Sequence, residues 1–385
     1  TGSSRMTDLL RLDELLSTEE KAVRDRVRAF CDAEVVPDAA GRWERAEFPF
    51  ELVPRLAGLG VCGGTLAGLS KVAAGLVALE LGRADGSLAT FFGVQSGLVM
   101  QSIAQLGSDA QREAWLPRLA AIEAVGAFAL TEPEHGSDVA GGLETRARRL
   151  GDGIVLHGEK RWIGNASFAD VIVVWARDDE GGVGGYLVER GATGLRTKVI
   201  QGKSSLRAVW QSDVSLDGVR VPLEARLPGC ASFADLSRVL TVTRVSVAWR
   251  CAGSALACYE AALAYVGERR QFGAPLASFQ LVQERLAGMA AETAAMLLLC
   301  HRLAQIEPTA AEAALAKMHN ARAARRIAAD ARDLLGGNGI LLDLHVTRHQ
   351  ADLEAVFTFE GTDWINALIV GRELTGIQAF TKGGR

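Results

Sequence analysis

The sequence predicts an α+β protein with an N-terminal α-helical domain, a middle antiparallel β-domain and a C-terminal four-helix-bundle domain. Three observations lead to this fold class. Apolar residues recur at helical spacing through the first third of the chain. From about residue 124 the chain changes to short β-branched segments separated by Gly, Asp and Asn turns. From about residue 232 long Ala-rich helical segments return. We therefore place the domains at 6–123, 124–231 and 232–385.

The N-terminal domain begins with a capping box. Ser17 and Glu20 are spaced as the N-cap and N3 residues of a helix, and apolar residues follow at helical spacing. Pro37 is expected to end this helix, because proline has no backbone N–H to donate. Residues 1–5 resemble an expression remnant ahead of Met6 and are left out of the fold prediction. Further helices are expected over residues 50–59, 72–83, 97–105 and 109–121.

The middle and C-terminal domains follow from the same kind of pattern. No Gly-x-Gly-x-x-Gly follows a strand, which counts against a nicotinamide-binding Rossmann fold. The order of elements also differs from the alternating βαβ units of a parallel sheet. Strands are expected over residues 124–130, 153–157, 171–175, 185–188, 196–200 and 214–216. Helices are expected over residues 239–269, 276–305, 310–335 and 365–374.

Composition excludes several classes of protein. The 385 residues are 49% hydrophobic and 23% charged, which is typical of a well-packed globular protein of two or three domains. The net charge of −4 gives no basic footprint for nucleic acid. No apolar run appears long enough to span a membrane, and the best candidate, 239–249, is interrupted by Arg244. The six cysteines show no metal-binding spacing, and no secretory signal is present, so we expect reduced thiols, no metal site and a cytoplasmic protein.

Glu360 is the candidate catalytic residue. It lies between Phe359 and Gly361, directly before the amphipathic segment 365–374. A carboxylate desolvated by neighbouring aromatic rings has a raised pKa, which suits a base that removes a C–H proton. The alternative is an ordinary acid at a helix N-terminus, which the helix dipole stabilises. The local pattern alone leaves both interpretations open.

Four other segments are candidates for binding a cofactor. The turn 130–138 carries hydroxyls and backbone amides that can hold a phosphate or a flavin edge, and Trp162 offers a flat surface for a ring. Arg269 and its neighbour Arg270 could bind a pyrophosphate. The glycines of 336–339 would let a dinucleotide approach closely. Each segment also has an ordinary structural explanation: a plain turn, a core tryptophan, solvated arginines or a glycine C-cap.

Taken in order, these segments resemble the acyl-CoA dehydrogenase family over nearly the whole chain, and within it glutaryl-CoA dehydrogenase most closely. The resemblance implies a homotetramer or homodimer that binds FAD between the β-domain and the bundle, with a neighbouring subunit completing the site. It also implies an acyl thioester substrate and an electron acceptor such as an electron-transfer flavoprotein. The stretches that carry the resemblance are 94–96, 130–133, 173–177, 200–203, 269–275, 331–340, 359–362 and 374–380.

The resemblance also implies roles for individual residues. Gly164 stands where a threonine or serine usually donates to flavin N5, a function that its backbone amide could keep. The residues that match cofactor-binding positions are Thr131, Ser137, Trp162, Gly164, Arg269, Phe272, Gln280, Gly336, Gly337, Gly339 and Thr362. The residues expected to contact the substrate are Phe359, Arg244, Val247, Arg250 and Gly361.

The implied reaction is α,β-dehydrogenation. Glu360 removes the α-proton while a hydride passes from Cβ to flavin N5. The thioester carbonyl accepts hydrogen bonds from the Glu360 N–H and from a ribityl hydroxyl. Some relatives carry the base at the position of Thr243, which cannot act as one, so Glu360 is left as the base. A flavin-dependent monooxygenase or oxidase on the same fold is the alternative function, and a non-catalytic helical protein is a third.

The sequence departs from glutaryl-CoA dehydrogenase in the acyl pocket. The arginine that holds glutarate's distal carboxylate falls at Ala89, its serine partner at Gly93 and a nearby acid at Gly82. We therefore expect a substrate other than glutaryl-CoA, because an unpaired buried carboxylate is costly. Arg250 replaces a small residue and either binds an anionic acyl group or pairs with another helix.

A second departure concerns the glycine-rich loop at 65–72. Compared with the family that the chain resembles, this loop is about five residues shorter than usual. A shorter loop would open the mouth of the substrate site. An open mouth would suit a bulky acyl group or a thioester presented on an acyl carrier protein.

Overall fold

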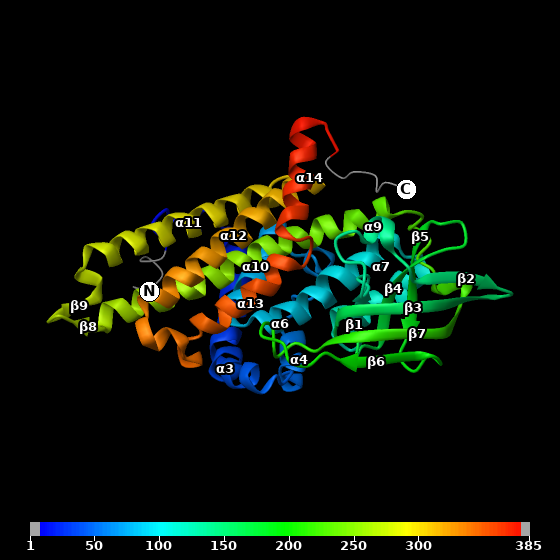
Figure 1. Ribbon diagram of the computed structural model, residues 1–385, viewed down its shortest axis with the longest axis horizontal. Helices are drawn as coiled ribbons and strands as arrows, with labels where there is room; N and C mark the ends of the chain where they lie inside the picture. The colour runs from blue at the N-terminus through cyan, green and yellow to red at the C-terminus, as the bar shows by residue number, and fades with distance from the viewer. Residues whose placement is uncertain (1–7, 379–385) are drawn as a thin grey trace.

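A computed structural model describes residues 8–378 and confirms the predicted fold class. The last two residues of the family-like stretch 374–380 lie outside the described residues. Figure 1 shows the sheet at one end of the molecule and the long helices of the C-terminal region extending to the other end, with the N-terminal helices packed between them.

The N-terminal region is helical, and the Ser17–Glu20 capping box is present. The prediction for Pro37 was wrong. It occupies the first turn of α3, where a backbone N–H has no helical acceptor to lose, so the chain stays helical through a π-helical turn. The helices are η1 Leu12–Leu15, α2 Thr18–Phe30, η2 Cys31–Val35, α3 Val36–Arg45, η3 Phe50–Leu52, α4 Val53–Ala57, η4 Gly64–Ala67, α5 Lys71–Ala84, α6 Gly86–Phe92, η5 Gly93–Val99, α7 Met100–Leu106 and α8 Asp109–Ala120.

The middle region is a seven-stranded sheet with the order β1-β4-β2-β3-β7-β6, and β5 pairs with β4. Most pairs are antiparallel, as expected, but β1 pairs in parallel with β4, so the sheet is mixed. The exposed, arginine-rich β2 was not predicted, because only one of its residues is buried. The elements are β1 Gly126–Ala129, α9 Val139–Gly142, β2 Arg146–Leu150, β3 Gly153–Gly164, β4 Val171–Arg177, β5 Val183–Glu189, β6 Leu195–Val199, β7 Gln211–Pro222 and η6 Leu223–Ala225.

The C-terminal region is a bundle built around α10, a helix of 36 residues. The sequence did not predict α13, because its buried face carries Arg348, His349 and Asp352, which hide the apolar periodicity. The elements are α10 Phe233–Glu268, β8 Arg270–Gln271, β9 Ala274–Pro275, η7 Leu276–Ser278, α11 Gln280–Ala304, α12 Ala310–Leu334, η8 Gly336–Ile340, η9 Leu342–Leu344, α13 Val346–Thr358 and α14 Asp363–Thr375.

Two glycines bring α5 and α10 into close contact. A Cβ atom at Gly253 would lie 2.0 Å from the carbonyl oxygen of Leu79. A Cβ atom at Gly82 would lie 2.7 Å from the carbonyl oxygen of Arg250 and 2.9 Å from its Cγ. Backbone can approach backbone here only because the side chains are absent. The side chain of Arg250 therefore lies directly against the backbone of α5.

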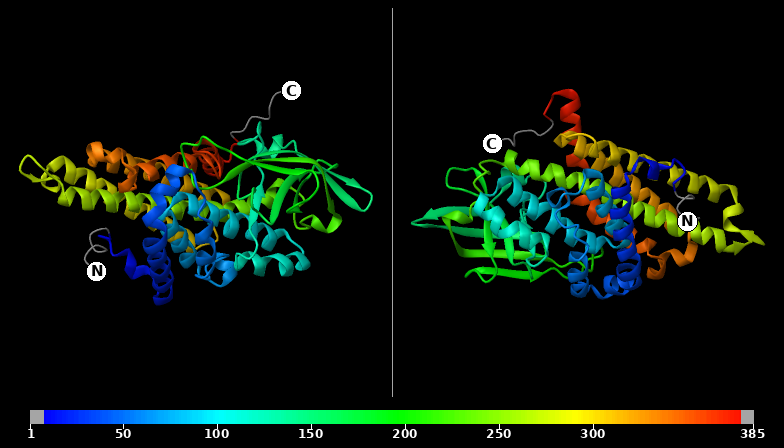
Figure 2. Two further views of the ribbon diagram at one scale, coloured as in Figure 1. Left: turned by 90° about the horizontal axis from the view of Figure 1, so that it is seen from below. Right: turned by 180° about the vertical axis from the view of Figure 1, so that it is seen from behind.

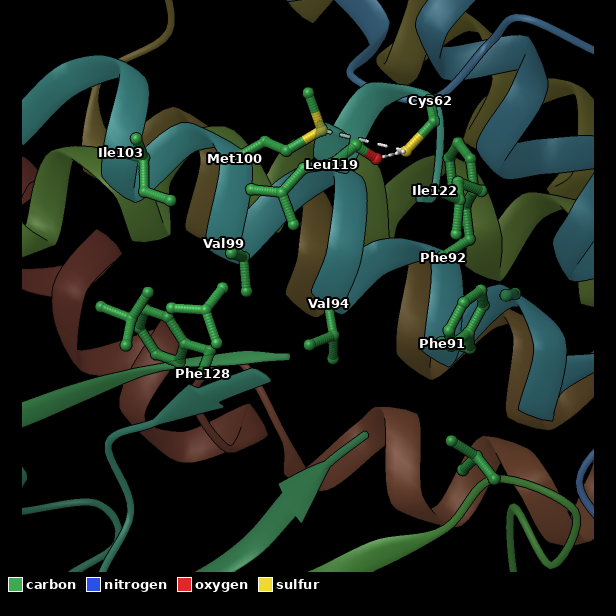
Figure 3. Close-up of a cluster of buried hydrophobic side chains, with 14 of the residues drawn as sticks. Cys62, Phe91, Phe92, Val94, Val99, Met100, Ile103, Leu119, Ile122 and Phe128 are labelled. Carbon is green, nitrogen blue, oxygen red and sulfur yellow. Dashed lines mark hydrogen bonds between the residues drawn. The ribbon is translucent and has the colours of Figure 1, made fainter. Parts of the chain in front are cut away.

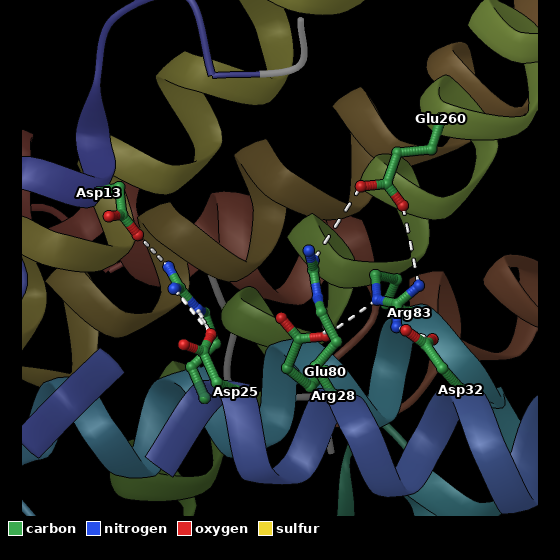
Figure 4. Close-up of polar contacts among 8 residues, drawn as sticks. Asp13, Asp25, Arg28, Asp32, Glu80, Arg83 and Glu260 are labelled. Carbon is green, nitrogen blue, oxygen red and sulfur yellow. Dashed lines mark hydrogen bonds and ion pairs between the residues drawn. The ribbon is translucent and has the colours of Figure 1, made fainter. Parts of the chain in front are cut away.

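A network of charges ties α2 to the same helix pair (Figure 4). Fully buried Glu80 accepts from Nε of Arg28 at 3.0 Å and from Nε of Arg83 at 2.9 Å. The carboxylate of Glu260 on α10 lies 3.8 Å from Arg83. Each buried charge here faces an opposite charge, which reduces the cost of removing it from water.

A continuous apolar cluster joins the N-terminal helices to the sheet. Figure 3 shows Phe91, Phe92 and Val94 from the segment α6–η5, and Met100 and Ile103 of α7 further along the helix, as members of one apolar cluster. Phe128 of β1 belongs to the same cluster, so the first strand packs directly on the helical region. The sheet and the helices are thereby fixed relative to one another at the place where a cavity opens between them.

One helix requires a correction about membrane spans. By length and composition alone, α11 could cross a membrane. The sequence suggests 239–249 as the best candidate and predicts no apolar segment long enough to span a membrane. The prediction underestimated the Ala- and Leu-rich middle of this helix. In the structure α11 packs against α10 and α12, and one such helix is weak evidence for a membrane span because helices of soluble bundles pass the same test.

Candidate active site

A cavity of about 1210 Å³ lies where the three regions meet. Its wall is formed by α5, α6 and η5, by the ends of β1 and β3, by the first half of α10 and by the loop between α13 and α14. This volume exceeds the range of about 300–1,000 Å³ that is usual for small-molecule sites. The predicted site residues that line it are Thr131, Ser137, Trp162, Gly164, Arg244, Val247, Arg250, Phe359, Glu360 and Gly361.

Glu360 lies on the cavity wall with its carboxylate held in place. The hydroxyl of Thr243 on α10 donates to Oε2 at 3.1 Å, and Nε of Arg244 donates to the Glu360 backbone carbonyl at 3.1 Å. Both donors come from one turn of α10, so that helix fixes the side chain and the backbone of Glu360 together. The backbone at Glu360 is left-handed, with φ of 55°, a conformation that costs free energy and that occurs often at functional sites.

Two side chains, Lys317 and Asn366, hold the loop that carries Glu360 by bonding to its backbone carbonyls. Nζ of Lys317 on α12 donates to the carbonyl oxygens of Phe357 at 3.1 Å and of Gly361 at 2.7 Å. Nδ2 of Asn366 donates to the same Gly361 oxygen at 2.7 Å. A buried cation that bonds to two carbonyls of one loop limits the movement of that loop.

Burial shifts the pKa values of Glu360 and of Lys317, which holds its loop. Desolvation raises the pKa of Glu360 above its usual value of 4.5, against the opposing effects of Arg244, Thr243 and Lys317. Desolvation also lowers the pKa of Lys317 to about 8. A carboxylate with a raised pKa is a stronger proton acceptor, as a base in a dry cavity needs to be. The desolvation that the flanking aromatics suggested is therefore present.

Thr243, Lys317 and Asn366 are site residues that the sequence did not identify. The sequence indicates only that Thr243 cannot act as a base, whereas in the structure its hydroxyl donates to the Glu360 carboxylate. The signal in the sequence was its position directly before Arg244, a residue already predicted to contact the substrate. Lys317 is fully buried on a long Ala-rich helix, where a lysine needs a partner, and that burial could not be read from the sequence.

The sheet forms the opposite wall of the cavity. Buried Lys160 on β3 donates to Oε1 of Glu132 at 2.9 Å, and this pair pins the turn that carries Thr131 and Ser137. The register between β3 and β7 shifts between Lys160 and Ile163. Trp162 lies in that irregularity with φ of 65° and is 48% exposed. A bulge redirects a side chain, and here it brings the indole to the cavity wall.

The residues of this wall fit a flat aromatic cofactor. Gly136 and Gly141 line the cavity, and an added Cβ atom at either would meet nothing within 4 Å, so there is space beside the backbone. Gly164 also lines it, and a Cβ atom there would lie 3.3 Å from Val94. Backbone amides, two hydroxyls and an exposed indole are the groups that a flavin ring and its polar edge require.

A second group of predicted cofactor residues lies away from the cavity. Arg269, Phe272 and Gln280 are exposed, and Phe272 is 95% exposed in the β8–β9 hairpin. Asn338, in the loop of Gly336, Gly337 and Gly339, donates to the hydroxyl of Tyr265 near the same hairpin. Figure 2 shows this end of the molecule opposite the sheet in both views. A single chain therefore does not bring these residues to the cavity.

The remaining predicted positions have clear structural settings. Thr362 caps α14 by accepting from the N–H of Ile365 at 3.2 Å, and it does not line the cavity. Ala89 and Gly93 do line it, at the positions where the arginine and serine were missing. The shortened loop at 65–72 contributes no residue to the cavity wall, so it gives no support to the idea of a wider mouth.

The fold and the site together define an enzyme. A desolvated carboxylate and a wall suited to a flat cofactor line one cavity, which is large enough for both a cofactor and a substrate. Among residues 8–378, no cluster of three or more His, Cys, Asp or Glu side chains could hold a metal ion. This arrangement suits an oxidoreductase that uses a bound organic cofactor.

The chain belongs to the acyl-CoA dehydrogenase family. The N-terminal, middle and C-terminal domains of that family match residues 17–123, 127–219 and 233–375. The probable acyl-CoA dehydrogenase YngJ of Bacillus subtilis (strain 168) is 32% identical, over 93% of this chain and 98% of its own length. The crystal structure of glutaryl-CoA dehydrogenase from Mycobacterium smegmatis is 42% identical, with a TM-score of 0.95 over 97% of this chain and 99% of that one.

The comparisons confirm the family, the fold and the enzyme class. Members of this family are flavoprotein oxidoreductases that use FAD. A structure of a glutaryl-CoA dehydrogenase from Mycobacterium smegmatis in complex with FADH2 is 39% identical, with a TM-score of 0.95 over 97% of this chain and 98% of that one. The expected FAD and the expected likeness to glutaryl-CoA dehydrogenase are therefore both confirmed, whereas the roles of individual residues stay predictions.

Proposed function

We propose that this chain catalyses FAD-dependent α,β-dehydrogenation of an acyl thioester, with Glu360 as the base that removes the α-proton. The supporting observation is the Glu360 carboxylate, which is desolvated on the cavity wall and oriented by Thr243. Bound FAD supplies the hydride acceptor for the hydrogen that leaves Cβ. In this reaction the chain has three tasks: to orient the base, to polarise the thioester and to keep water out.

The backbone N–H of Glu360 is suited to polarise the thioester carbonyl. Within the described residues, this N–H has no hydrogen-bond acceptor. An N–H held in a rigid loop beside the base stabilises negative charge on the carbonyl oxygen as the α-proton leaves. Arg244 holds the carbonyl of Glu360, and Lys317 holds those of Phe357 and Gly361, so the loop around this N–H is fixed before substrate enters.

Proton transfer requires Glu360 to be ionised when substrate binds. The raised pKa of Glu360 lies closer to the pKa of an α-proton that hydrogen bonds to the thioester carbonyl have acidified. The hydroxyl of Thr243 orients one oxygen of the Glu360 carboxylate. The apolar wall from Leu81, Leu98 and Val247 limits water around the reacting carbons. Excluding water also protects the reduced cofactor from wasteful reoxidation.

The experiment is an anaerobic titration of the FAD-loaded protein with a panel of acyl thioesters, followed by the loss of flavin absorbance. A matching thioester is expected to bleach the flavin in wild type. Glu360→Gln is expected to keep FAD and to lose the bleaching. Bleaching of the variant at the wild-type rate would contradict the role of Glu360. Rapid oxygen consumption by the reduced wild-type enzyme would instead favour the flavin monooxygenase or oxidase.

The preferred acyl group is proposed to differ from glutaryl. Ala89 leaves the position of the usual arginine apolar, and its side chain is buried at the cavity wall. Turnover of glutaryl-CoA at the rate of the best substrate would contradict this. The carrier is either coenzyme A or an acyl carrier protein, and the same acyl group presented on both carriers, compared by kcat/KM, decides between them.

We also propose how the chain assembles and where in the cell it works. A homotetramer or homodimer is supported by the exposed hairpin and loop, which carry predicted FAD-binding residues far from the cavity of their own chain. Light scattering of the purified holoenzyme tests it, and a monomer that retains FAD would contradict it. An electron-transfer flavoprotein is the proposed acceptor, tested by reduction of that protein in a coupled assay. The six buried, unpaired cysteines fit a cytoplasmic enzyme, which cell fractionation can test.

A further inference from the structure

Arg250 places a buried positive charge in the wall of the cavity. Its side chain is 5% exposed, and it is one of the residues that line the cavity. Nη2 donates to the carbonyl oxygen of Gly86 at 2.7 Å, at the start of α6. The guanidinium carbon lies 5.4 Å from the ring centroid of Phe359, the residue next to the base. The charge therefore faces the space that an acyl chain must occupy.

Within the described residues this charge has no ion-pair partner. No carboxylate oxygen lies within 4.0 Å of an Arg250 nitrogen, and its buried Nε has no hydrogen-bond acceptor. Two carboxylates act on this charge without pairing with it: Asp85 pairs with Arg348 at 2.8 Å, and Asp352 accepts from Trp43 at 2.7 Å through Oδ1, while its Oδ2 has no hydrogen-bond partner among residues 8–378. The alternative reading of Arg250 as a salt bridge to another helix is therefore not supported.

The surroundings of Arg250 match the departures from the family pattern. The missing arginine would lie at Ala89, and Gly86, which accepts from Arg250, lies one turn earlier on the same helix. The missing acid would lie at Gly82, where a Cβ atom would approach Cγ of Arg250 to 2.9 Å. Where α6 lacks an arginine at position 89, Arg250 of α10 therefore supplies a positive charge within one turn of that position.

We infer that Arg250 binds a carboxylate carried on the acyl chain of the substrate, so that the substrates are thioesters of dicarboxylic acids. This inference rests on the proposed function, because the same cavity holds the reacting carbons. The guanidinium N–H groups that do not bond to Gly86 are shielded from water, and they can donate to a carboxylate. A neutral acyl chain would leave that buried charge without a counterion.

The spacing along α10 indicates how far the carboxylate lies from the reacting carbon. Thr243, which contacts the base, and Arg250 are seven positions apart on one helix, an axial rise of about 10 Å. The arginine side chain covers part of that distance. The carboxylate therefore lies several bonds beyond the α-carbon. Because the guanidinium comes from α10 rather than from the position of Ala89, the favoured chain is expected to differ from glutaryl in length or branching.

The test compares matched pairs of thioesters on the FAD-loaded full chain. Succinyl-, glutaryl- and adipyl-CoA are paired with butyryl-, pentanoyl- and hexanoyl-CoA, which have the same number of acyl carbons. Wild type is expected to prefer at least one carboxylated member of a pair in kcat/KM. Arg250→Met, of similar length but neutral, is expected to lower that value at least about 30-fold while changing the neutral partner less than about 3-fold. Arg250→Lys, which keeps the charge, is expected to restore part of the loss.

The outcomes separate this inference from the proposed function. If neutral thioesters bleach the flavin as well as every carboxylated partner does, the inference fails and the dehydrogenase stands. If no thioester of either kind bleaches bound FAD, the dehydrogenase itself fails. Equal losses for both members of each pair in Arg250→Met would make Arg250 a structural residue. Should that variant not fold, the wild-type preference alone decides, and a ratio at or below one overturns the inference.

Discussion

Two buried arginines meet the same short turn between α5 and α6, and they differ in what faces them. Arg348 is fully buried, pairs with Asp85 at 2.8 Å and donates to the carbonyl of Ala84 at 2.8 Å. Arg250 donates to the carbonyl of Gly86 and otherwise faces the cavity. The first charge is compensated within the fold, whereas the second is left to a ligand. Removal of Arg348 should therefore affect stability, and removal of a charge on the cavity side should affect chemistry.

The largest effect is expected on the cavity side, from Glu360→Gln. Loss of a general base lowers the chemical rate by about 10²- to 10⁴-fold. The rate of flavin bleaching with a saturating thioester measures this effect. Because the amide keeps the shape of the side chain, FAD content and the melting temperature at neutral pH should not fall. A variant that loses FAD or melts early would show that Glu360 also supports the fold.

On the compensated side, Arg348→Met should lower the free energy of unfolding by about 3–5 kcal/mol, because it leaves Asp85 as a buried unpaired charge. Chemical denaturation of the holoenzyme measures the change. The protein that remains folded should bleach at close to the wild-type rate. A loss of rate without a loss of stability would remove the distinction between the two arginines.

Lys317→Met should have a smaller effect than either of these substitutions, and the effect should be on catalysis. The substitution leaves the carbonyls of Phe357 and Gly361 without their shared donor, so the loop of the base loosens. Misplacement of a reacting group lowers kcat by about 10- to 100-fold. Because Lys317 acts through the position of Glu360, kcat should fall more than KM rises. Lys317→Arg, which can donate to both carbonyls, is the matched variant and should recover part of kcat.

A smaller effect should appear in the pH dependence of stability. The pKa of Glu360 is raised in the folded state, so the folded protein holds this proton more tightly than the unfolded chain does. Stability from this group is present below the ordinary pKa of 4.5 and falls as the pH rises through the higher folded pKa. Glu360→Gln should therefore melt above wild type at pH 8, by a margin that shrinks toward pH 4.5. A constant margin would contradict the shift.

The smallest effect is expected for an exposed arginine, which serves as the control for Arg348→Met. Arg196 and Asp217 form an ion pair at 3.2 Å on the sheet surface with both side chains more than two-thirds exposed. Arg196→Ala should change the free energy of unfolding by about 0–1 kcal/mol, because water and salt screen such pairs. Activity and denaturation midpoints should both stay near wild type. A large change would mean that the cost at Arg348 cannot be attributed to burial.

The sequence predicted most elements because their signals are local. The Ser17–Glu20 capping box and the glycine after α12 were both recognised from neighbouring residues. It failed where the deciding contact is distant. The parallel pairing of β1 with β4 depends on a partner more than forty residues away, and Pro37 is tolerated because of where the helix restarts.

The candidate site divides in the same way. Glu360 and the residues around it were recognised from their types and order, and ten predicted residues line one cavity. Two contacts could not be read from the chain: Thr243 with Glu360, and Arg250 with Gly86. Both join segments that are more than a hundred residues apart. The positions at 269–280 and 336–339 lie away from the cavity of their own chain, and their types and order in the sequence do not reveal this.

The close approach of α5 and α10 at Gly82 also limits how this enzyme can be engineered. Any side chain introduced there meets the backbone oxygen of Arg250 at 2.7 Å, whatever residue occupies position 250. Placing an acidic residue at position 82 alone would therefore push α5 and α10 apart before it altered substrate choice. Libraries that vary position 82 should vary the facing turn of α10 in the same clones.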